Sequence, residues 1–331
     1  MKRYLYITFA VVWVLIGCTH KELCYHHPHQ KDVTVVFDWS GAPNVTPHSM
    51  CVYFYAEDGS SWQRFDFNGH LGGTAKLHVG RYHAIFYNND TTGLLFSDTD
   101  SFEKHTLYTR EGDVLEPIYG NTARHTPRAR NTEDQMVTIC PDMVYGGYAV
   151  DIEVTDFGVK YSYLSSRNNV LVTVDSPDIV LTLYPVQQTA RYTYEITNVK
   201  NLKYASSMCA SLSGMAYSLA IGEGELSPTN VIIPFAAKPE LANNRITGEF
   251  ITFGHHQAND EKHMFVLYVI FDNGEKYYYT FDVTDQVDGA EDSLHIHLEI
   301  NDLSFPTPIY NGNGFQVGVD DWERVEQDLI L

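Results

Sequence analysis

Hydrophobic and polar residues alternate with a period of two in short runs along most of the chain. Residues 33–39, 191–197 and 294–300 each place mainly apolar side chains on one face and mainly polar or mixed ones on the other. This period is typical of β-strands with one buried face. In the last run His295 and His297 fall on the polar face, so we expect both histidines on the exposed side of a strand.

Turn signals between the runs indicate the fold class. Residues 264–271 form a nearly continuous apolar run, which indicates a strand buried on both faces, and the Asp-Asn-Gly sequence at 272–274 is a strong hairpin signal. Residues 205–220 could be helical by composition, but their serines and glycine favour strand and turn. Residues 97–110 are a weak helix candidate. Because no long amphipathic helix appears, we predict an all-β protein of antiparallel β-sandwiches.

Two domains in series are expected. The chain has 331 residues, and a domain typically takes roughly 100–200 residues. Residues 141–147 follow a strand pattern and indicate a hinge, so we place the boundary between Gly146 and Gly147. The predicted domains are therefore residues 33–146 and residues 147–331.

The N-terminal segment has the features of an export signal. Two basic residues precede an apolar stretch over residues 4–16, which is shorter than the span of about 20 residues that a bilayer requires but suits a signal peptide. The stretch ends at Gly17-Cys18 and resembles a bacterial lipobox. The resemblance implies a signal peptide over residues 1–17, cleavage before Cys18, and acylation there with fatty acids such as palmitate. An ordinary secretory signal with an incidental cysteine is the alternative.

Residues 18–32 are expected to form a lipidated tether, because they contain a proline, four histidines and no hydrophobic period. The remaining cysteines are Cys24, Cys51, Cys140 and Cys209. Four cysteines in an exported protein allow three pairings. Widely spaced cysteines in a chain of this size are more often buried apolar residues, so we predict no bridge and leave their redox state open.

The charge balance excludes one class of partner. The chain carries 42 acidic and 22 basic side chains, for a formal net charge of -20. Nucleic-acid binding needs clustered cations, so no nucleic-acid partner is expected. Removal of the first 17 residues would take away two cations and leave a net charge of -22. A mature chain with this negative charge would be held at a membrane by lipid and not by charge.

Catalytic signatures are absent from the sequence. It contains no GxSxG, HExxH or Walker A motif, so we predict no enzyme activity, no catalytic residue and no cofactor. His255, His256 and His263 form a loose group with acidic residues 260 and 261 nearby. Histidines in loops beside a strand are the simpler account, so no metal site is predicted there. Calcium binding is left open.

Several short segments occur in an order that resembles a known family. They are the lipobox before Cys18 and residues 80–88, 141–146, 212–216, 248–254, 281–287 and 314–322. Together these segments resemble the fimbrillin-like lipoproteins of anaerobic Gram-negative bacteria, in the uncharacterised branch grouped with fimbrial anchor and accessory subunits. The resemblance covers nearly the whole mature chain, and the order of the segments carries it.

This resemblance implies two transthyretin-like β-sandwich domains, display on the outer membrane at the cell surface, and assembly with other fimbrial subunits by β-strand complementation. In polymerising relatives a protease removes the first strand after a basic residue in a loop. Here Arg64 and Arg81 are not in convincing loops, and the basic loop at residues 124–130 comes too late in the chain. We therefore expect an unprocessed fimbrial anchor or accessory subunit, with adhesion as its wider role.

A surface carbohydrate-binding lipoprotein is the alternative function, because aromatic rings can stack on sugars. Trp39, Trp62 and Trp322 remain once the signal peptide is removed, and Trp39 is expected in the core. The apolar C-terminus after a glycine-rich loop indicates a last strand. Whether that strand pairs within its own domain or with a partner is left open, as is the identity of any host or glycan receptor.

Overall fold

The computed structural model describes residues 30–120, 135–165, 170–256, 262–308 and 322–325. This part of the chain is almost entirely β-structure, which confirms the predicted fold class. The helical elements in it are α2 (Glu116–Tyr119), α3 (Thr284–Asp288) and three 3-10 turns, η1 (Trp39–Gly41), η2 (Leu202–Tyr204) and η3 (Leu241–Asn243). None of these helices is long and apolar enough to cross a membrane. The helix considered at residues 97–110 is wrong, because that segment contains strand β7 (Thr106–Thr109).

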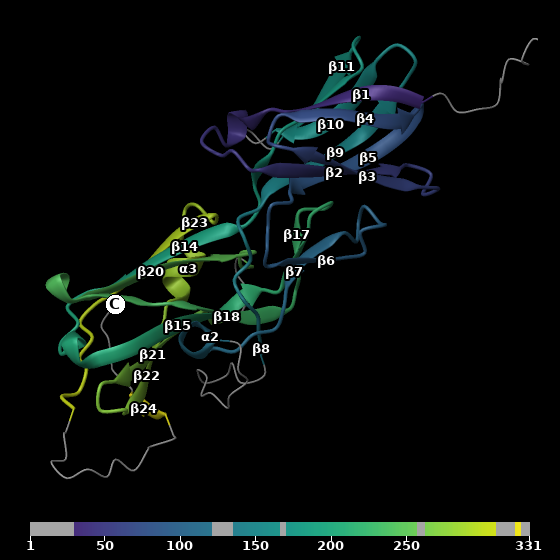
Figure 1. Cartoon of the computed structure of the whole chain (residues 1–331). Helices are drawn as coiled ribbons and strands as arrows, with labels where there is room; N and C mark the ends of the chain where they lie inside the picture. Colours follow the sequence, from purple (N-terminus) through teal and green to yellow (C-terminus); the bar gives the residue numbers. More distant parts are fainter. Residues whose placement is uncertain (1–29, 121–134, 166–169, 257–261, 309–321, 326–331) are drawn as a thin grey trace, which may run out of the picture.

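The N-terminal sandwich consists of two sheets that face each other across one core (Figure 1). Its strands are β1 (Gln30–Phe37), β2 (Ser49–Ala56), β3 (Trp62–Asn68), β4 (Gly72–His78), β5 (Gly80–Asn88), β9 (Tyr145–Val154), β10 (Val159–Ser165), β11 (Val170–Ser176), β12 (Val180–Leu183) and β13 (Val186–Gln187). One sheet has the order β12-β1-β4. The other has the order β11-β10-β9-β5-β2-β3, and β13 pairs with β9.

The alternation in β1 shows why this segment forms the middle strand of the three-stranded sheet. Val33, Val35 and Phe37 point into the core and are 0%, 1% and 3% exposed, whereas Thr34 and Val36 face solvent. Burying one such side chain stabilises the fold by about 1.5–3 kcal/mol. The period of two in the sequence therefore identified the buried face of this strand correctly.

The C-terminal sandwich also has two sheets around one core. Its strands are β8 (Met136–Val137), β14 (Ala190–Ile196), β15 (Ala205–Ala216), β18 (Asn230–Ala236), β19 (Lys238–Glu240), β20 (Arg245–Thr252), β21 (Met264–Phe271), β22 (Lys276–Asp282), β23 (His295–Ile300) and β24 (Glu323–Val325). The sheet orders are β19-β20-β14-β23 and β24-β22-β21-β15-β18-β8. Phe235 and Phe250 stack between the sheets with ring centroids 3.7 Å apart.

A small bridging sheet lies between the two sandwiches (Figure 1). Its strands are β6 (Leu94–Ser97), β7, β16 (Ser218–Ala220) and β17 (Glu225–Leu226), in the order β17-β16-β7-β6. Leu107 and Leu219 of this sheet pack against Tyr53, Tyr55 and Tyr87 from the outer face of the N-terminal sandwich. Most strand pairs are antiparallel, as predicted, but β1–β12, β8–β18, β14–β23 and β22–β24 run parallel.

The sequence indicated a domain boundary at Gly146 and Gly147. In the structure the chain still pairs with strands of the N-terminal sandwich at these residues. Both glycines lie inside β9 and pair with Tyr87 and Phe86 of β5. A Cβ atom at Gly146 would lie 2.2 Å from the Phe86 carbonyl oxygen, so this glycine permits close contact between two strands and does not form a hinge. Strands β9 to β13 pair with N-terminal strands, and the changeover comes between β13 and β14.

Candidate functional site

The predicted lipidation site, Cys18, lies outside the described residues. The described chain begins at Gln30, the first residue of β1, which pairs with His78 of β4. The tether that was predicted over residues 18–32 therefore overlaps β1 at its C-terminal end. The chain enters β1 at the end of the N-terminal sandwich that faces away from the C-terminal sandwich (Figure 1).

The described cysteines form no disulfide. Cys51, Cys140 and Cys209 are free thiols, and Cys24 lies outside the described residues. Burial raises the pKa of Cys51 to about 12 and that of Cys140 to about 11. Such thiols are protonated at neutral pH and behave as small apolar side chains.

The arginines considered as processing sites lie in strands. Arg64 is in β3, where it donates to the Asp66 carboxylate at 2.7 Å and lies over the Tyr53 ring. Arg81 is in β5, 3.9 Å from the Glu57 carboxylate. The basic loop at residues 124–130 lies outside the described residues. The prediction that neither Arg64 nor Arg81 occupies a loop is confirmed.

Two of the three grouped histidines meet in the structure. His263 is fully buried, and its ring centroid lies 5.4 Å from that of His255. The Tyr192 hydroxyl lies 2.8 Å from His255 Nδ1, and burial lowers the pKa of His255. His256 points elsewhere, with its Nε2 atom 2.8 Å from the Ser227 carbonyl oxygen. The acidic residues 260 and 261 lie outside the described part.

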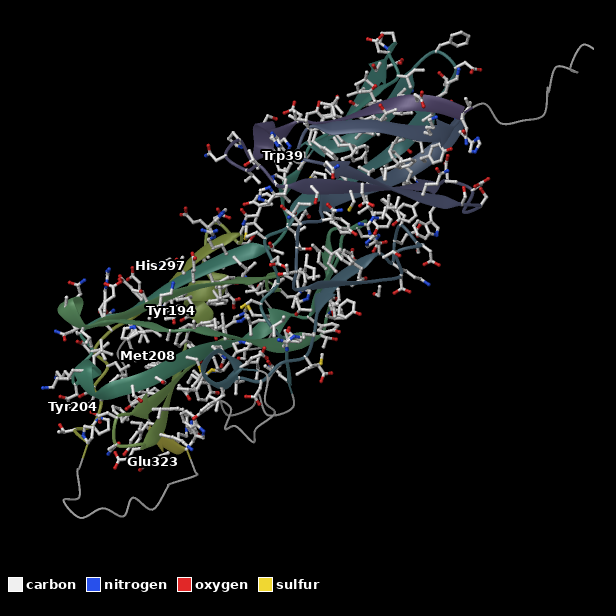
Figure 2. All side chains as sticks on the ribbon, viewed as in Figure 1. Trp39, Tyr194, Tyr204, Met208, His297 and Glu323 are labelled. Carbon is white, nitrogen blue, oxygen red and sulfur yellow. The ribbon has the colours of Figure 1, made fainter. Side chains whose placement is uncertain are left out.

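A second group combines a histidine with two carboxylates. Ligand atoms of Glu195, His297 and Glu299 lie within 4.8 Å of one another on the outer face of β14 and β23. His297 is exposed, as the alternation predicted, and Figure 2 shows it on the side of the C-terminal sandwich opposite Glu323. Arg245 lies 3.5 Å from Glu195 and already balances part of the negative charge. Glu195 is half-buried whereas His297 and Glu299 are exposed, and a cation bound here would compete with Arg245 for Glu195.

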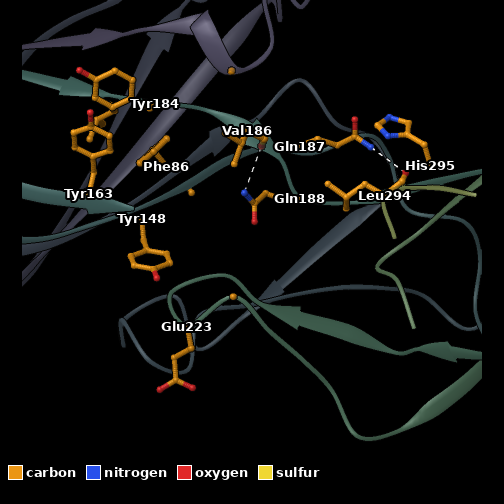
Figure 3. Close-up of a pocket in the computed structure, with 14 residues that line it drawn as sticks. Phe86, Tyr148, Tyr163, Tyr184, Val186, Gln187, Gln188, Glu223, Leu294 and His295 are labelled. Carbon is orange, nitrogen blue, oxygen red and sulfur yellow. Dashed lines mark hydrogen bonds between the residues drawn. The ribbon is translucent and has the colours of Figure 1, made fainter. Parts of the chain in front are cut away.

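A cavity of about 570 Å³ opens where the two sandwiches and the bridging sheet meet (Figure 3). Its lining comes from η1, β5, β9, β10 and the end of β12, from the segment that joins β12 to β14, from the turn at residues 223–224 and from residues 294–295. Ligand sites commonly occupy junctions of this kind and this size. The cavity is therefore a candidate ligand site.

Tyrosines form one wall of this cavity. The rings of Tyr163 and Tyr184 stack with centroids 4.1 Å apart and planes 21° apart. Burial raises the pKa of Tyr184 above its ordinary value, so its hydroxyl stays protonated. Tyr148 extends from β9 toward the turn that carries Glu223 (Figure 3).

Sequence reasoning missed these cavity residues. The tryptophans that it singled out lie elsewhere: Trp39 is half-buried and donates from Nε1 to the His70 carbonyl oxygen at 2.7 Å. Trp62 is 42% exposed on β3, and Trp322 packs against Tyr268. No local sequence pattern distinguishes the cavity tyrosines from the other tyrosines, because tertiary contacts bring them together.

The sheet edges are the other surfaces that could receive a partner. In the larger C-terminal sheet the outermost described strands are β8 and β24. Strand β24 pairs in parallel with β22, where Glu323 lies opposite Tyr277 and Val325 lies opposite Tyr279. Unpaired backbone groups on an edge strand are a template for another chain. The described part of the predicted last strand thus pairs within its own sheet.

The chain matches the model of one protein family. The model of a domain of unknown function, DUF5119, matches residues 17–236. The chain belongs to the DUF5119 family. The matched stretch of this DUF5119 chain includes the N-terminal sandwich, the bridging sheet and most of the cavity lining, but Leu294 and His295 lie beyond it.

Individual proteins extend the comparison. The DUF5119 chain is 21% identical over 248 residues to Fim4B of Bacteroides ovatus, a candidate fimbrium anchoring subunit. The match covers 75% of this chain and 63% of Fim4B, so it spans less than two thirds of that relative.

One solved structure agrees in fold. A candidate adhesin from Bacteroides ovatus superposes with a TM-score of 0.60 at 19% identity, over 89% of this chain and 99% of that one. The fimbrial anchor protein Mfa2 from Porphyromonas gingivalis gives a TM-score of 0.45 at 11% identity, over 82% and 90% of the two chains. The first of these likenesses shows that the DUF5119 chain shares its fold with the adhesin candidate.

Proposed function

We propose that the chain is a fimbrial anchor or accessory subunit that acts in adhesion at the cell surface. The observation that carries this proposal is the sequence match to Fim4B over 75% of the chain. The shared fold with the Bacteroides ovatus adhesin candidate supports it. The role is structural and not enzymatic, and its partners are other fimbrial subunits.

We further propose that lipid on Cys18 holds the protein in the outer membrane. Residues 18–29 would then link the lipid to β1, and twelve extended residues reach at most about 40 Å. Because β1 starts at the end of the N-terminal sandwich remote from the C-terminal sandwich, the tether would leave the C-terminal sandwich on the outer side (Figure 1). Several acyl chains give a stable anchor, whereas a single chain does not.

Substitution of the lipidated cysteine tests the anchor. Cys18→Ser should lose the lipid mass on the N-terminal peptide and leave the outer-membrane fraction, because the acyl chains provide the attachment. Cys24→Ser is the matched control, since it removes a nearby thiol and keeps the lipobox. Equal membrane fractions for wild type and Cys18→Ser would contradict the proposed anchor.

We propose that subunits join by β-strand complementation at the edge occupied by β24. The described part of β24 has only three paired residues and runs parallel to β22. Parallel pairs are slightly less stable per residue than antiparallel ones, so a longer antiparallel strand from a partner can compete for the β22 edge. Such an added strand gains main-chain hydrogen bonds along its whole length.

Site-specific photo-cross-linking on whole cells tests this joining mode. A photoreactive residue at Glu323, on the edge strand, should give an adduct with another fimbrial subunit. The same residue at Leu71, which is 70% exposed on the N-terminal sandwich, is the control. Recovery of only free monomer from the Glu323 position would count against complementation at this edge.

A further inference from the structure

Two glutamine side chains, Gln187 and Gln188, line the cavity at the junction of the sandwiches. Gln187 Nε2 donates to the Thr189 carbonyl oxygen at 2.9 Å and to the Leu294 carbonyl oxygen at 3.4 Å. Gln188 Nε2 donates to the Gly146 carbonyl oxygen at 3.0 Å. These bonds fix both amide groups, and neither Oε1 atom accepts a hydrogen bond from a described residue. The glutamines therefore offer oriented acceptors to a ligand with hydroxyl or N–H donors.

The same cavity offers apolar ring surface. The stacked pair Tyr163 and Tyr184 and the ring of Tyr148 stand on one side of it, and the buried Phe86 lies beside them (Figure 3). Aromatic faces carry a partial negative charge and attract C–H groups that bear a partial positive charge. A ligand that fits this wall has flat patches of C–H groups beside its polar groups.

The charged residues around the cavity limit the net charge that a ligand can carry. No lysine or arginine is among its lining residues, and the ring of the lining residue His295 already lies 2.9 Å from the Asp292 carboxylate, so an anionic ligand would find no unpaired lining cation. Glu223 is an exposed lining residue, and Figure 3 shows its carboxylate pointing away from the labelled tyrosines. A cationic ligand would need a carboxylate inside the cavity. The lining thus favours a neutral ligand.

We infer that this junction cavity binds a neutral sugar unit of an oligosaccharide. A pyranose ring combines hydroxyl donors for Gln187 and Gln188 with a C–H face for the tyrosines. A volume of about 570 Å³ lies within the range of small-molecule sites and leaves room for more than one ring. The inference does not depend on the proposed fimbrial role, because it rests on the cavity alone.

Filling the cavity tests this inference directly. The full mature chain, in detergent, is applied to an array of neutral, sialylated and sulfated glycans, and the affinity of the neutral glycans that bind is measured by titration calorimetry. Val186→Trp places a large ring in the cavity and should weaken binding by at least tenfold. Leu71→Trp adds the same ring at an exposed site outside the cavity and should leave the affinity unchanged.

A second variant covers the case in which Val186→Trp does not fold. Tyr148→Ala removes part of the aromatic wall without adding volume and should also weaken binding severalfold, while its thermal unfolding is followed in parallel. The inference is overturned by any of three results. No neutral glycan binds at about 1 mM; only charged glycans bind; or a neutral glycan binds wild type and the folded cavity variants equally.

Discussion

Acidification should destabilise the junction through His105. This side chain is fully buried, with its Nδ1 atom 2.7 Å from the Tyr55 hydroxyl and its Nε2 atom 3.0 Å from the Tyr87 hydroxyl. Because the Tyr55 hydroxyl donates to the Thr99 carbonyl oxygen, it accepts from Nδ1–H, and Nε2 accepts from Tyr87. A protonated ring would donate from both nitrogens and break this arrangement. Burial, and then the charge of Arg64, lower the pKa of His105 to about 4.

The sign and size of the effect follow from proton linkage. The unfolded chain binds a proton at His105 with a pKa of about 6.5, and the folded chain with a pKa of about 4. The contribution of neutral His105 to the free energy of unfolding is therefore fully present above the unfolded pKa. It is lost as the pH drops toward the folded pKa. The loss from this group is about 2 kcal/mol at pH 5 and about 3 kcal/mol below pH 4.

Urea unfolding at pH values from about 8 to 5 measures this loss. His105→Gln keeps a hydrogen-bonding side chain that does not titrate, so wild type should lose about 2 kcal/mol more than the variant over this range. His48→Gln, at an exposed position, is the matched control and should behave as wild type. Burial also lowers the pKa of His255. The free energy of unfolding of wild type and of His105→Gln should therefore both still decrease with falling pH through His255.

The comparison has a clear refuting outcome. If His105→Gln and wild type lose the same free energy of unfolding between pH 8 and pH 5, His105 is not held neutral in the folded state. A larger loss in the variant would refute the reasoning equally, because it would reverse the sign of the linkage.

Three further substitutions or treatments probe the packing. Gly248→Ala would place a Cβ atom 2.5 Å from the Tyr194 ring, so we expect a loss of about 1–3 kcal/mol in urea unfolding. Phe235→Ala removes a ring stacked in the C-terminal core and should cost about 3–5 kcal/mol in the same measurement. Cys51 and Cys209 are 0% exposed, and burial raises the pKa of both thiols, so neither should react with a thiol-specific disulfide reagent until urea unfolds the chain.

The two substitutions have matched controls, and the cysteine prediction has a contradicting outcome. Gly80→Ala meets its nearest atoms at 3.7 Å, an ordinary contact distance, and should be far milder than Gly248→Ala. Phe157→Ala removes a ring that is 88% exposed and should change stability little compared with Phe235→Ala. Rapid labelling of Cys51 in the folded protein would contradict its burial.

The local features of this fold could be predicted from the sequence because they depend on neighbouring residues. The alternation at residues 33–37 identified the buried face of β1, but Trp39, expected on the same strand and in the core, lies half-buried in η1. The run at 264–271 forms β21, which is flanked by β15 and β22. The Asp-Asn-Gly turn at 272–274 joins β21 to β22 as expected. Residues 205–220 are strands β15 and β16, so the choice of strand over helix was also right.

The strand partners could not be predicted in the same way. Strand β7 pairs with β16, and β1 pairs with β12, across more than a hundred residues of sequence in each case. No short-range period encodes such pairings, which depend on the packing of whole sheets. Gly146 illustrates the difficulty, because a glycine pair indicates a hinge as readily as a close contact between strands. The cavity residues were missed for the same reason.

The way the chain crosses the junction bears on how rigid the cavity is. After β5 the chain leaves the N-terminal sandwich to form β6 and β7, returns through β9, and leaves again after β13. The walls therefore come from several strands, held by ladders of backbone hydrogen bonds, together with the short segments beside them, and not from one loop. A site held in this way is formed before its ligand arrives, which reduces the ordering entropy that binding costs. Substitutions inside the cavity should accordingly change affinity without changing the fold, whereas changes to the bridging sheet should alter both.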